Sequence, residues 1–266
     1  MSGLFCSPDF TRSAAVVTGG GRGIGAAIAR AYAAAGARVT IDGRQEASLK
    51  AVCDEIVTTG GEAYYVVGDV TDPSHLEELM AAAASEYGRI DVLVNNAGIP
   101  GPTAPLDELT LEDWNETLTA NLTSVFLACR AALPYLRRAD RAKIVNIGSV
   151  TGKRPLPNRT PYAAAKLGVV GLSRTLAHEL GPDGISVNTI SPWLVGGDRL
   201  TQVVESMAHE RALSNEELWA EFTDGTVFKR PVQEEDIARL ALMLGSSAAD
   251  NITGQDLNVS AGAVMY

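Results

Sequence analysis

The strongest constraint on the fold is a regular alternation of short β-branched runs with longer stretches of helical pattern. The runs are expected to be strands, and they lie at 14–18, 38–42, 63–69, 91–96, 142–148, 185–190 and 256–259. Several of them are almost continuously apolar, which is typical of parallel strands covered by helices on both faces. The alternation therefore predicts an α/β fold built on a doubly wound, mainly parallel sheet.

Proline pairs mark where helices begin and end. Asp72 followed by Pro73 is an N-cap with proline at the first helical position, and Thr160 followed by Pro161 repeats this pattern. Gly181 and Pro182 end the second of these helices. Tyr162 is therefore expected in the first turn of a helix of roughly twenty residues.

Nothing in the sequence divides the chain. It contains no linker, repeat or low-complexity segment, so residues 1–266 are expected to form a single domain. The long segment at about 193–230 departs from the alternation and lies between the sixth and seventh expected strands. A long excursion of this kind is a candidate lid over a substrate.

Composition excludes several classes of function. The net charge of −10 argues against a nucleic-acid partner or an anionic membrane surface. No apolar run approaches the ~20 residues of a bilayer span, and no apolar stretch follows a basic start as in a secretory signal. We therefore expect a cytoplasmic protein. The scattered cysteines and histidines indicate neither a disulfide framework nor a metal site.

A glycine-rich turn follows the first expected strand, in the sequence "VVTGGGRGIG". Gly19, Gly23 and Gly25 allow a tight turn and let backbone N–H groups approach a diphosphate at the start of a helix. A glycine pattern alone is also compatible with a merely tight strand–helix turn. Its position in the first β–α unit favours dinucleotide binding.

The stretch "PYAAAK" places Tyr162 and Lys166 four residues apart, on one helical face. Such a pair can be an ordinary solvated contact. It can also be functional, because a phenol of pKa ~10 is a poor acid near neutrality. An ammonium ~5 Å away, at an effective dielectric constant of ~20, contributes about 3 kcal/mol, or roughly two pKa units.

Taken together, the motifs resemble the short-chain dehydrogenase/reductase family of single-domain type. The resemblance begins with Thr-Gly-x-x-x-Gly-x-Gly at 18–25 and continues in order to about residue 262. Ser149 ends the fifth expected strand, thirteen residues before Tyr162, as in the family. The other matching segments are "GDV" at 68–70, "NNAG" at 95–98, Asn121 in "NLTSVF", "SVNTISP" at 186–192 and "ITGQDLNVSAG" at 252–262.

The resemblance implies a Rossmann-type sheet of seven strands in the order 3-2-1-4-5-6-7. It implies an NAD(P)-dependent oxidoreductase that interconverts a secondary alcohol and a ketone by hydride transfer. Tyr162 would transfer the proton to or from the carbonyl oxygen. Lys166 would lower the pKa of Tyr162 and bind the nicotinamide ribose, Ser149 would hydrogen-bond the substrate oxygen, and Asn121 would hold a water linking Lys166 to solvent.

The same resemblance implies where the coenzyme binds. The expected contacts are Thr18, Gly19, Gly21, Arg22, Gly23, Ile24, Gly25, Asp42, Gly43, Arg44, Asp69, Val70, Asn96, Ala97, Gly98, Tyr162, Lys166, Pro192 and Val195.

The choice between NAD and NADP depends on the residues after the second expected strand. NAD-using relatives carry an acidic residue at the place that falls on Gly43 here, whereas Asp42 stands one residue earlier and on the opposite face. Arg44 and Arg22 occupy places where NADP-using relatives carry basic residues. The sequence favours NADP. NAD stays open, because Asp42 could reach the ribose if the turn tightens, and the arginines could be solvated surface charges.

Two residues after Pro192 depart from the family pattern. Trp193 stands where the family usually has Gly, and Gly197 where it often has Thr. Trp193 is compatible with an apolar wall for the substrate and equally with a core or subunit contact. Backbone N–H groups at 195–197 could replace the missing threonine.

The substrate is a small-molecule carbonyl or alcohol whose identity cannot be read from the sequence. The pocket is expected to be lined from 99–104, 150–159 and 193–222. These segments carry Arg154, Arg159 and Arg199, which could bind an anionic group or remain surface charges. A catalytically silent dinucleotide sensor on the same fold is the main alternative, and a sugar-nucleotide epimerase a weaker one. The resemblance also implies a homo-oligomer, a tetramer or a dimer.

Overall fold

The computed structural model describes residues 9–197, 200–201, 204–205, 208 and 212–266. Its centre is a seven-stranded sheet in the order β3-β2-β1-β4-β5-β6-β7, in which every strand pairing is parallel. The strands are β1 (Ala14–Val17), β2 (Arg38–Gly43), β3 (Glu62–Val67), β4 (Val92–Asn95), β5 (Lys143–Ile147), β6 (Ser186–Pro192) and β7 (Asp256–Val259). The predicted sheet order is confirmed, and the sheet is parallel throughout.

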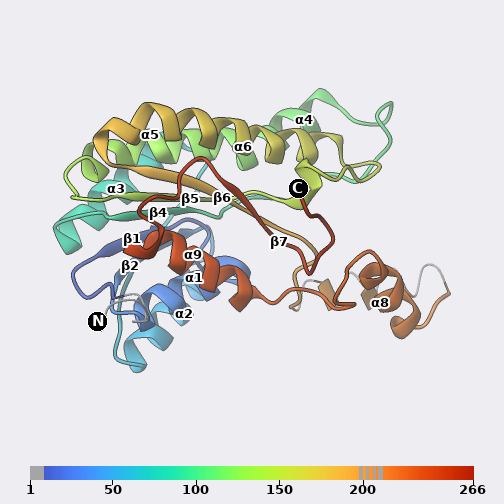
Figure 1. The fold of residues 1–266 in the computed structure, drawn as a ribbon, viewed down its shortest axis with the longest axis horizontal. Coiled ribbons are helices and arrows are strands. Elements are labelled where there is room, and N and C mark those ends of the chain that lie inside the picture. The colour runs from blue at the N-terminus through green and yellow to red at the C-terminus, as the bar shows by residue number, and fades with distance from the viewer. Residues whose placement is uncertain (1–8, 198–199, 202–203, 206–207, 209–211) are drawn as a thin grey trace.

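Helices cover both faces of this sheet, as Figure 1 shows. One apolar core lies beneath α1, α2 and α9, and a second lies beneath α3, α5 and α6. The helices are α1 (Gly23–Ala34), α2 (Glu46–Thr58), α3 (Pro73–Tyr87), α4 (Leu111–Leu118), α5 (Ser124–Leu136), α6 (Thr160–Leu180), α8 (Asn215–Asp224) and α9 (Glu234–Gly245). Strands buried on both faces explain the nearly continuous apolar runs of the sequence.

The helix boundaries follow the proline pairs closely. Asp72 caps α3 by accepting a hydrogen bond from the Ser74 N–H at 2.8 Å. In α6, Arg159 occupies the N-cap position and its side chain does not cap the helix, so Thr160 is the first helical residue rather than the cap. This one-residue correction leaves Tyr162 in the first turn, where it was expected.

The strand order reverses between β1 and β4, and ligands of open α/β sheets bind at such a point, beyond the carboxyl ends of the strands. The glycine turn, Asp42, Asn96, Ser149 and Pro192 all stand at this edge, because each ends or follows a strand.

The segment at 193–230 follows β6 and contains α8, which projects beyond the sheet in Figure 1. Its two ends are joined by a β-bridge between Val195 and Val232. Its own small core includes the buried Val204 and Leu218. The predicted lid includes residues outside the described ones, Arg199 among them, and its closing over a substrate stays a prediction.

Candidate active site

The turn between β1 and α1 has the geometry that its glycines predict. Gly19 and Gly23 have φ of +66° and +58°, in the left-handed region that favours glycine. A Cβ on Gly25 would lie 2.2 Å from the Gly19 carbonyl oxygen, so only glycine fits there. Arg22 precedes α1 and makes no side-chain cap, which leaves the first N–H groups of α1 as donors for an anion.

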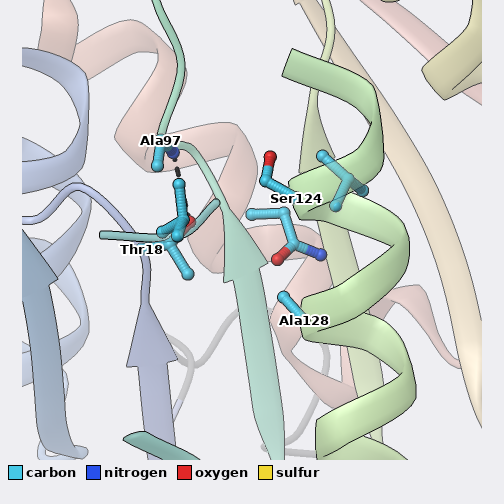
Figure 2. Close-up of a pocket in the computed structure, with 7 residues that line it drawn as sticks. Thr18, Ala97, Ser124 and Ala128 are labelled. Atoms are coloured by element: carbon cyan, nitrogen blue, oxygen red, sulfur yellow. Dashed lines mark hydrogen bonds between the residues drawn. The ribbon is translucent and has the colours of Figure 1, made fainter. Parts of the chain in front are cut away.

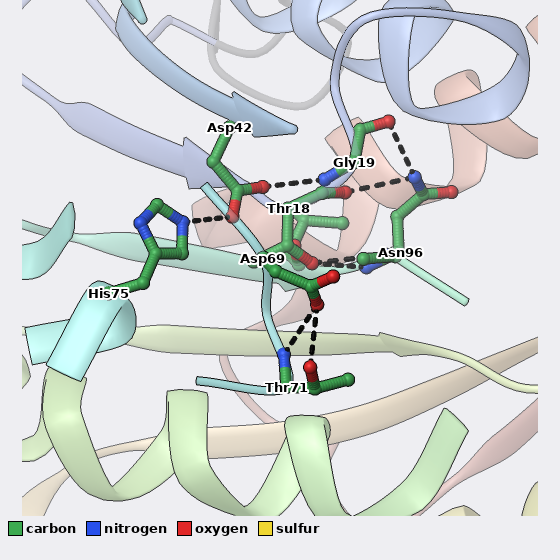
Figure 3. Close-up of polar contacts among 9 residues, drawn as sticks. Thr18, Gly19, Asp42, Asp69, Thr71, His75 and Asn96 are labelled. Carbon is green, nitrogen blue, oxygen red and sulfur yellow. Dashed lines mark hydrogen bonds and ion pairs between the residues drawn. The ribbon is translucent and has the colours of Figure 1, made fainter. Parts of the chain in front are cut away.

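Thr18 and Asn96 bind this turn to the end of β4 (Figure 3). The Thr18 hydroxyl accepts hydrogen bonds from the N–H groups of Asn96 at 3.0 Å and Ala97 at 3.1 Å. The Asn96 side-chain amide donates to the carbonyl oxygens of Thr18 at 2.9 Å and Gly19 at 3.1 Å. Both side chains therefore shape the coenzyme turn, and a direct contact with the coenzyme remains a prediction.

A small pocket lies behind this contact, between the end of β4 and α5 (Figure 2). Thr18, Ala97, Ser124 and Ala128 line it, and it is too small to hold a water molecule. We interpret it as a packing feature rather than a ligand site.

Asp42 is fully buried, in contrast to the expectation that it could contact the ribose. Its Oδ1 accepts a hydrogen bond from the Gly19 N–H at 2.7 Å, and its Oδ2 lies 3.0 Å from Nε2 of His75 (Figure 3). With zero exposure, the carboxylate supports the glycine turn from inside and is not presented to a ribose. Sequence reasoning missed His75, because 33 residues separate it from Asp42.

Two exposed arginines and a carboxylate flank the expected adenosine end of the site. Arg22 and Arg44 are both exposed, and an Nη atom of Arg44 lies 3.8 Å from Asp69. Asp69 accepts bonds from the Thr71 N–H and hydroxyl at 2.9 and 2.8 Å. Partial burial raises the pKa of Asp69, but the bonds from Thr71 and the charge of Arg44 outweigh this and leave the pKa below its usual value.

The tyrosine and lysine of α6 lie together as the spacing predicts. Lys166 is buried, its Nζ donates to the Ile147 carbonyl oxygen at 2.9 Å, and Nζ lies 5.8 Å from the centre of the half-buried Tyr162 ring. Burial lowers the pKa of Lys166 to about 8, because it disfavours the charged ammonium.

Ser149 follows β5 and begins the short 3-10 turn Val150–Gly152. Its hydroxyl oxygen accepts a hydrogen bond from the Thr151 N–H at 3.1 Å, and the side chain is half-buried. This bond uses a lone pair and leaves the hydroxyl proton for a second partner, as expected of a group that donates to a substrate oxygen.

Asn121 lies in a π-helical turn, Thr119–Thr123, between α4 and α5. Its side-chain amide donates to the carbonyl oxygens of Ile99 at 3.0 Å and Thr117 at 2.9 Å, whereas its buried Oδ1 has no partner. A Cβ on Gly98 would lie 2.5 Å from this oxygen and 3.7 Å from Nζ of Lys166. Oδ1 of Asn121 and Nζ of Lys166 therefore both lie beside Gly98, and a water between them would satisfy the buried Oδ1.

Arg159 packs directly against Tyr162. Its guanidinium lies 4.8 Å from the centre of the Tyr162 ring, and it donates to the Thr103 hydroxyl at 3.0 Å and the Pro100 carbonyl oxygen at 2.7 Å. Arg159 thereby joins the start of α6 to the loop after β4, and its binding of an anionic group stays a prediction.

The two departures from the family pattern lie just after β6. The Arg154 guanidinium lies 5.4 Å from the centre of the Trp193 ring, and Trp193 is half-buried at the start of the 193–230 segment. Gly197 has φ of +129°, a conformation closed to threonine, and a Cβ there would lie 2.9 Å from Oε1 of Glu234. Pro192 pairs with Val259 of β7 and Val195 with Val232, which sets the backbone at the two expected coenzyme contacts.

None of the described helices is long and apolar enough to cross a membrane.

Known proteins match this chain along nearly its whole length. The family described as short chain dehydrogenase matches residues 13–208. A 3-oxoacyl-[acyl-carrier-protein] reductase of Synechocystis is 36% identical over 257 residues, covering 96% of this chain and 98% of that protein. A D-beta-hydroxybutyrate dehydrogenase of Rhizobium meliloti is 33% identical over 251 residues, covering 93% of this chain and 97% of that protein.

A solved structure agrees with these matches. A variant of actinorhodin polyketide ketoreductase with NADPH has a TM-score of 0.90 and 36% identity to this chain, covering 97% of it and 100% of the ketoreductase. The similar proteins are reductases and dehydrogenases, so the alternative of a catalytically silent dinucleotide sensor is not supported.

Proposed function

The chain belongs to the short-chain dehydrogenases and is an NAD(P)-dependent oxidoreductase of alcohols and ketones, and on this basis we propose that it reduces a ketone with NADPH, using Tyr162 as the acid. The observation that carries the catalytic part is the grouping of Tyr162, the buried Lys166 and Ser149 at one edge of the sheet.

The residues at this edge suit a dinucleotide. The turn accepts no Cβ at Gly25, and the uncapped start of α1 offers N–H groups to a diphosphate. The exposed Arg22 and Arg44 favour the 2′-phosphate of NADPH, because hydrogen bonds to a charged group contribute ~1.5–3 kcal/mol each. The similar polyketide ketoreductase was solved with NADPH. When bound, NADPH supplies the hydride.

Residues of the chain donate the proton to the substrate and return a proton from solvent. Tyr162 donates its hydroxyl proton to the carbonyl oxygen of the substrate, and Ser149 donates a second hydrogen bond to the same oxygen. Lys166 provides positive charge beside Tyr162, which favours the phenolate that remains after proton transfer. Asn121 has a buried, unpartnered oxygen near Lys166, and this suits a water that returns a proton from solvent.

We propose a 3-oxoacyl group as the substrate class. Two of the similar proteins are named for acyl chains with an oxygen function at the third carbon: a 3-oxoacyl-[acyl-carrier-protein] reductase and a D-beta-hydroxybutyrate dehydrogenase. The half-buried Trp193 and the exposed Leu156 supply apolar surface in the expected pocket segments, which suits an acyl chain.

NADPH oxidation tests this function directly. We expect NADPH oxidation with a 3-oxoacyl thioester, weaker NADP⁺ reduction when sugars and tetritols are supplied as alcohol substrates in the reverse direction, and a loss of at least 10²-fold in Tyr162→Phe. Reaction with polyols and NADP⁺ alone, without reduction of the thioester, would contradict the substrate class. Tight NADPH binding without reduction of any carbonyl would contradict the catalytic proposal itself.

We also propose that the chain forms a homo-oligomer, a tetramer or a dimer. Phe126 of α5 and Leu167 of α6 are 45% and 51% exposed, on two helices that cover the same sheet face. Light scattering of the purified protein tests this assembly, and a monomer at micromolar concentration would contradict it.

A further inference from the structure

The coenzyme site contains an apparent contradiction in charge. Arg22 and Arg44 suit a 2′-phosphate, yet Asp42 stands at the carboxyl end of β2, where a carboxylate exposed to the ribose would repel that phosphate. The structure resolves this contradiction through the direction in which the Asp42 side chain points.

Both carboxylate oxygens of Asp42 are bound on the inner side of the turn. Oδ1 accepts from the Gly19 N–H at 2.7 Å and Oδ2 lies 3.0 Å from Nε2 of His75, while the Gly20 N–H bonds the Asp42 carbonyl oxygen at 3.0 Å. The side chain has no exposed surface. A buried carboxylate keeps this position only while it has partners, because an unpaired charge is strongly disfavoured away from water.

His75 is the partner that comes from outside the turn. It lies in the first turn of α3, is 6% exposed, and packs against the backbone at the end of β3. A Cβ on Gly68 would lie 2.0 Å from its Nδ1, so the ring reaches Asp42 only because residue 68 is glycine. The Gly68 N–H bonds the Gly43 carbonyl oxygen at 3.0 Å, which holds this glycine beside the end of β2.

We propose that His75 is a positioning residue for coenzyme choice: by donating its Nε2–H to Asp42, it keeps that carboxylate against Gly19 and leaves the ribose edge to Arg22 and Arg44, so that NADPH is preferred over NADH. The role rests on the proposed NADPH function. The hydrogen bond to Asp42 also raises the pKa of His75, which favours an imidazolium that offsets the charge of Asp42. Without this partner, Asp42 turns toward solvent and its charge reaches the phosphate.

The experiment compares two substitutions of similar size. His75→Met removes the donor, whereas His75→Gln keeps an N–H at about the reach of Nε2. We expect the ratio of kcat/KM for NADPH to kcat/KM for NADH to fall at least tenfold in His75→Met, mainly through a higher KM for NADPH. In His75→Gln the ratio should stay within about threefold of wild type.

A second substitution shows whether the effect passes through the charge of Asp42. Asp42→Asn removes this charge at constant size, so the double variant Asp42→Asn with His75→Met should regain most of the NADPH preference lost in His75→Met. If His75→Met does not fold, His75→Asn replaces it, because asparagine is smaller and its amide falls short of Asp42.

The outcomes separate this role from the proposed function. Equal losses of kcat/KM with both coenzymes, with an unchanged ratio, would overturn the positioning role and leave NADPH preference intact. Failure of Asp42→Asn to restore the ratio would also overturn it. A wild-type protein that prefers NADH would overturn the proposed coenzyme itself.

Discussion

The glycine turn and the 193–230 segment meet at the same edge of the sheet but are held in different ways. Side chains fix the turn, since the buried Asp42 and the partly buried Asn96 bond its backbone and the buried Thr18 hydroxyl joins it to the backbone at the end of β4. The 193–230 segment is held by backbone contacts, which include the Val195–Val232 bridge across its base and the bond from the Val227 N–H to the carbonyl oxygen of Ala261, just after β7, at 2.9 Å.

If the 193–230 segment selects the substrate, as we predict, coenzyme binding and substrate choice are carried by separate parts of the chain. Buried polar bonds are costly to leave incomplete, so the turn tolerates little change in sequence. The segment has its own small core around Val204 and Leu218, and its surface residues can vary without disturbing the coenzyme turn. The predictions below test this separation, from the largest expected effect to the smallest.

Tyr162 belongs to neither region, and its hydroxyl should serve chemistry alone. Tyr162→Phe should lower kcat at least 10²-fold, because it removes the acid without removing the ring beneath Arg159. Its affinity for NADPH, measured by fluorescence titration, should stay within about threefold of wild type. Near-normal turnover would refute the assignment of Tyr162 as the acid.

Adding one methyl group should have a larger effect in the glycine turn than in the 193–230 segment. A Cβ at Gly25 would meet backbone at 2.2 Å, whereas a Cβ at Gly225 would meet only the end of the Arg154 side chain, at 3.2 Å. Gly25→Ala should raise the KM for NADPH at least tenfold or prevent folding, and Gly225→Ala should change it less than twofold. KM values and melting temperatures of both variants check this, and equal effects would remove the contrast.

The buried pair of His75 and Asp42 should make part of the stability depend on pH. The hydrogen bond to Asp42 raises the pKa of His75 in the folded protein above its unfolded value of ~6.5. The contribution of this bond to the free energy of unfolding is therefore complete below about pH 6.5, and it is lost as pH rises through the pKa of His75 in the folded protein. The difference in unfolding free energy between wild type and His75→Gln should shrink as pH rises, as urea titrations would show. A difference that grows with pH would contradict this.

The smallest effect is expected at Trp193, at the start of the segment. Trp193→Leu removes the contact with the Arg154 guanidinium, and cation–π contacts of this kind contribute ~0.5–1 kcal/mol. The KM for the carbonyl substrate should rise about two- to fivefold, while the KM for NADPH stays unchanged. Steady-state kinetics with each substrate varied in turn measures both values, and a parallel rise in both would show that the two regions are coupled.

Local patterns were sufficient for most of the fold. The β-branched runs predict every described strand to within about two residues, and the proline pairs place α3 and α6. The spacing of Tyr162 and Lys166 predicts their shared face, because helix geometry alone brings residues four apart together. These predictions succeed because each depends on neighbours along the chain.

Features that depend on distant residues were not predicted. The π-helical turn that carries Asn121 lies within a continuous helical pattern and has no signal in the sequence. The engagement of Arg159 with Pro100 joins residues 59 positions apart. The sequence indicates only that Gly197 replaces a threonine of the family pattern. Its φ of +129° shows that the backbone at this position requires glycine.

Sequence alone was therefore enough for the strands, the glycine turn and the neighbourhood of Tyr162 and Lys166, since motif spacing and backbone periodicity act over short distances, and the family resemblance supplied the sheet order. Strand alternation places the Asp42 side chain on the opposite face from Gly43, but its burial and its partners could not be predicted in this way. They come from the Gly19 N–H, from a histidine 33 residues away and from a glycine that admits the imidazole ring. Only tertiary packing determines whether a carboxylate at the end of a strand faces a coenzyme or is buried beneath the turn that binds one.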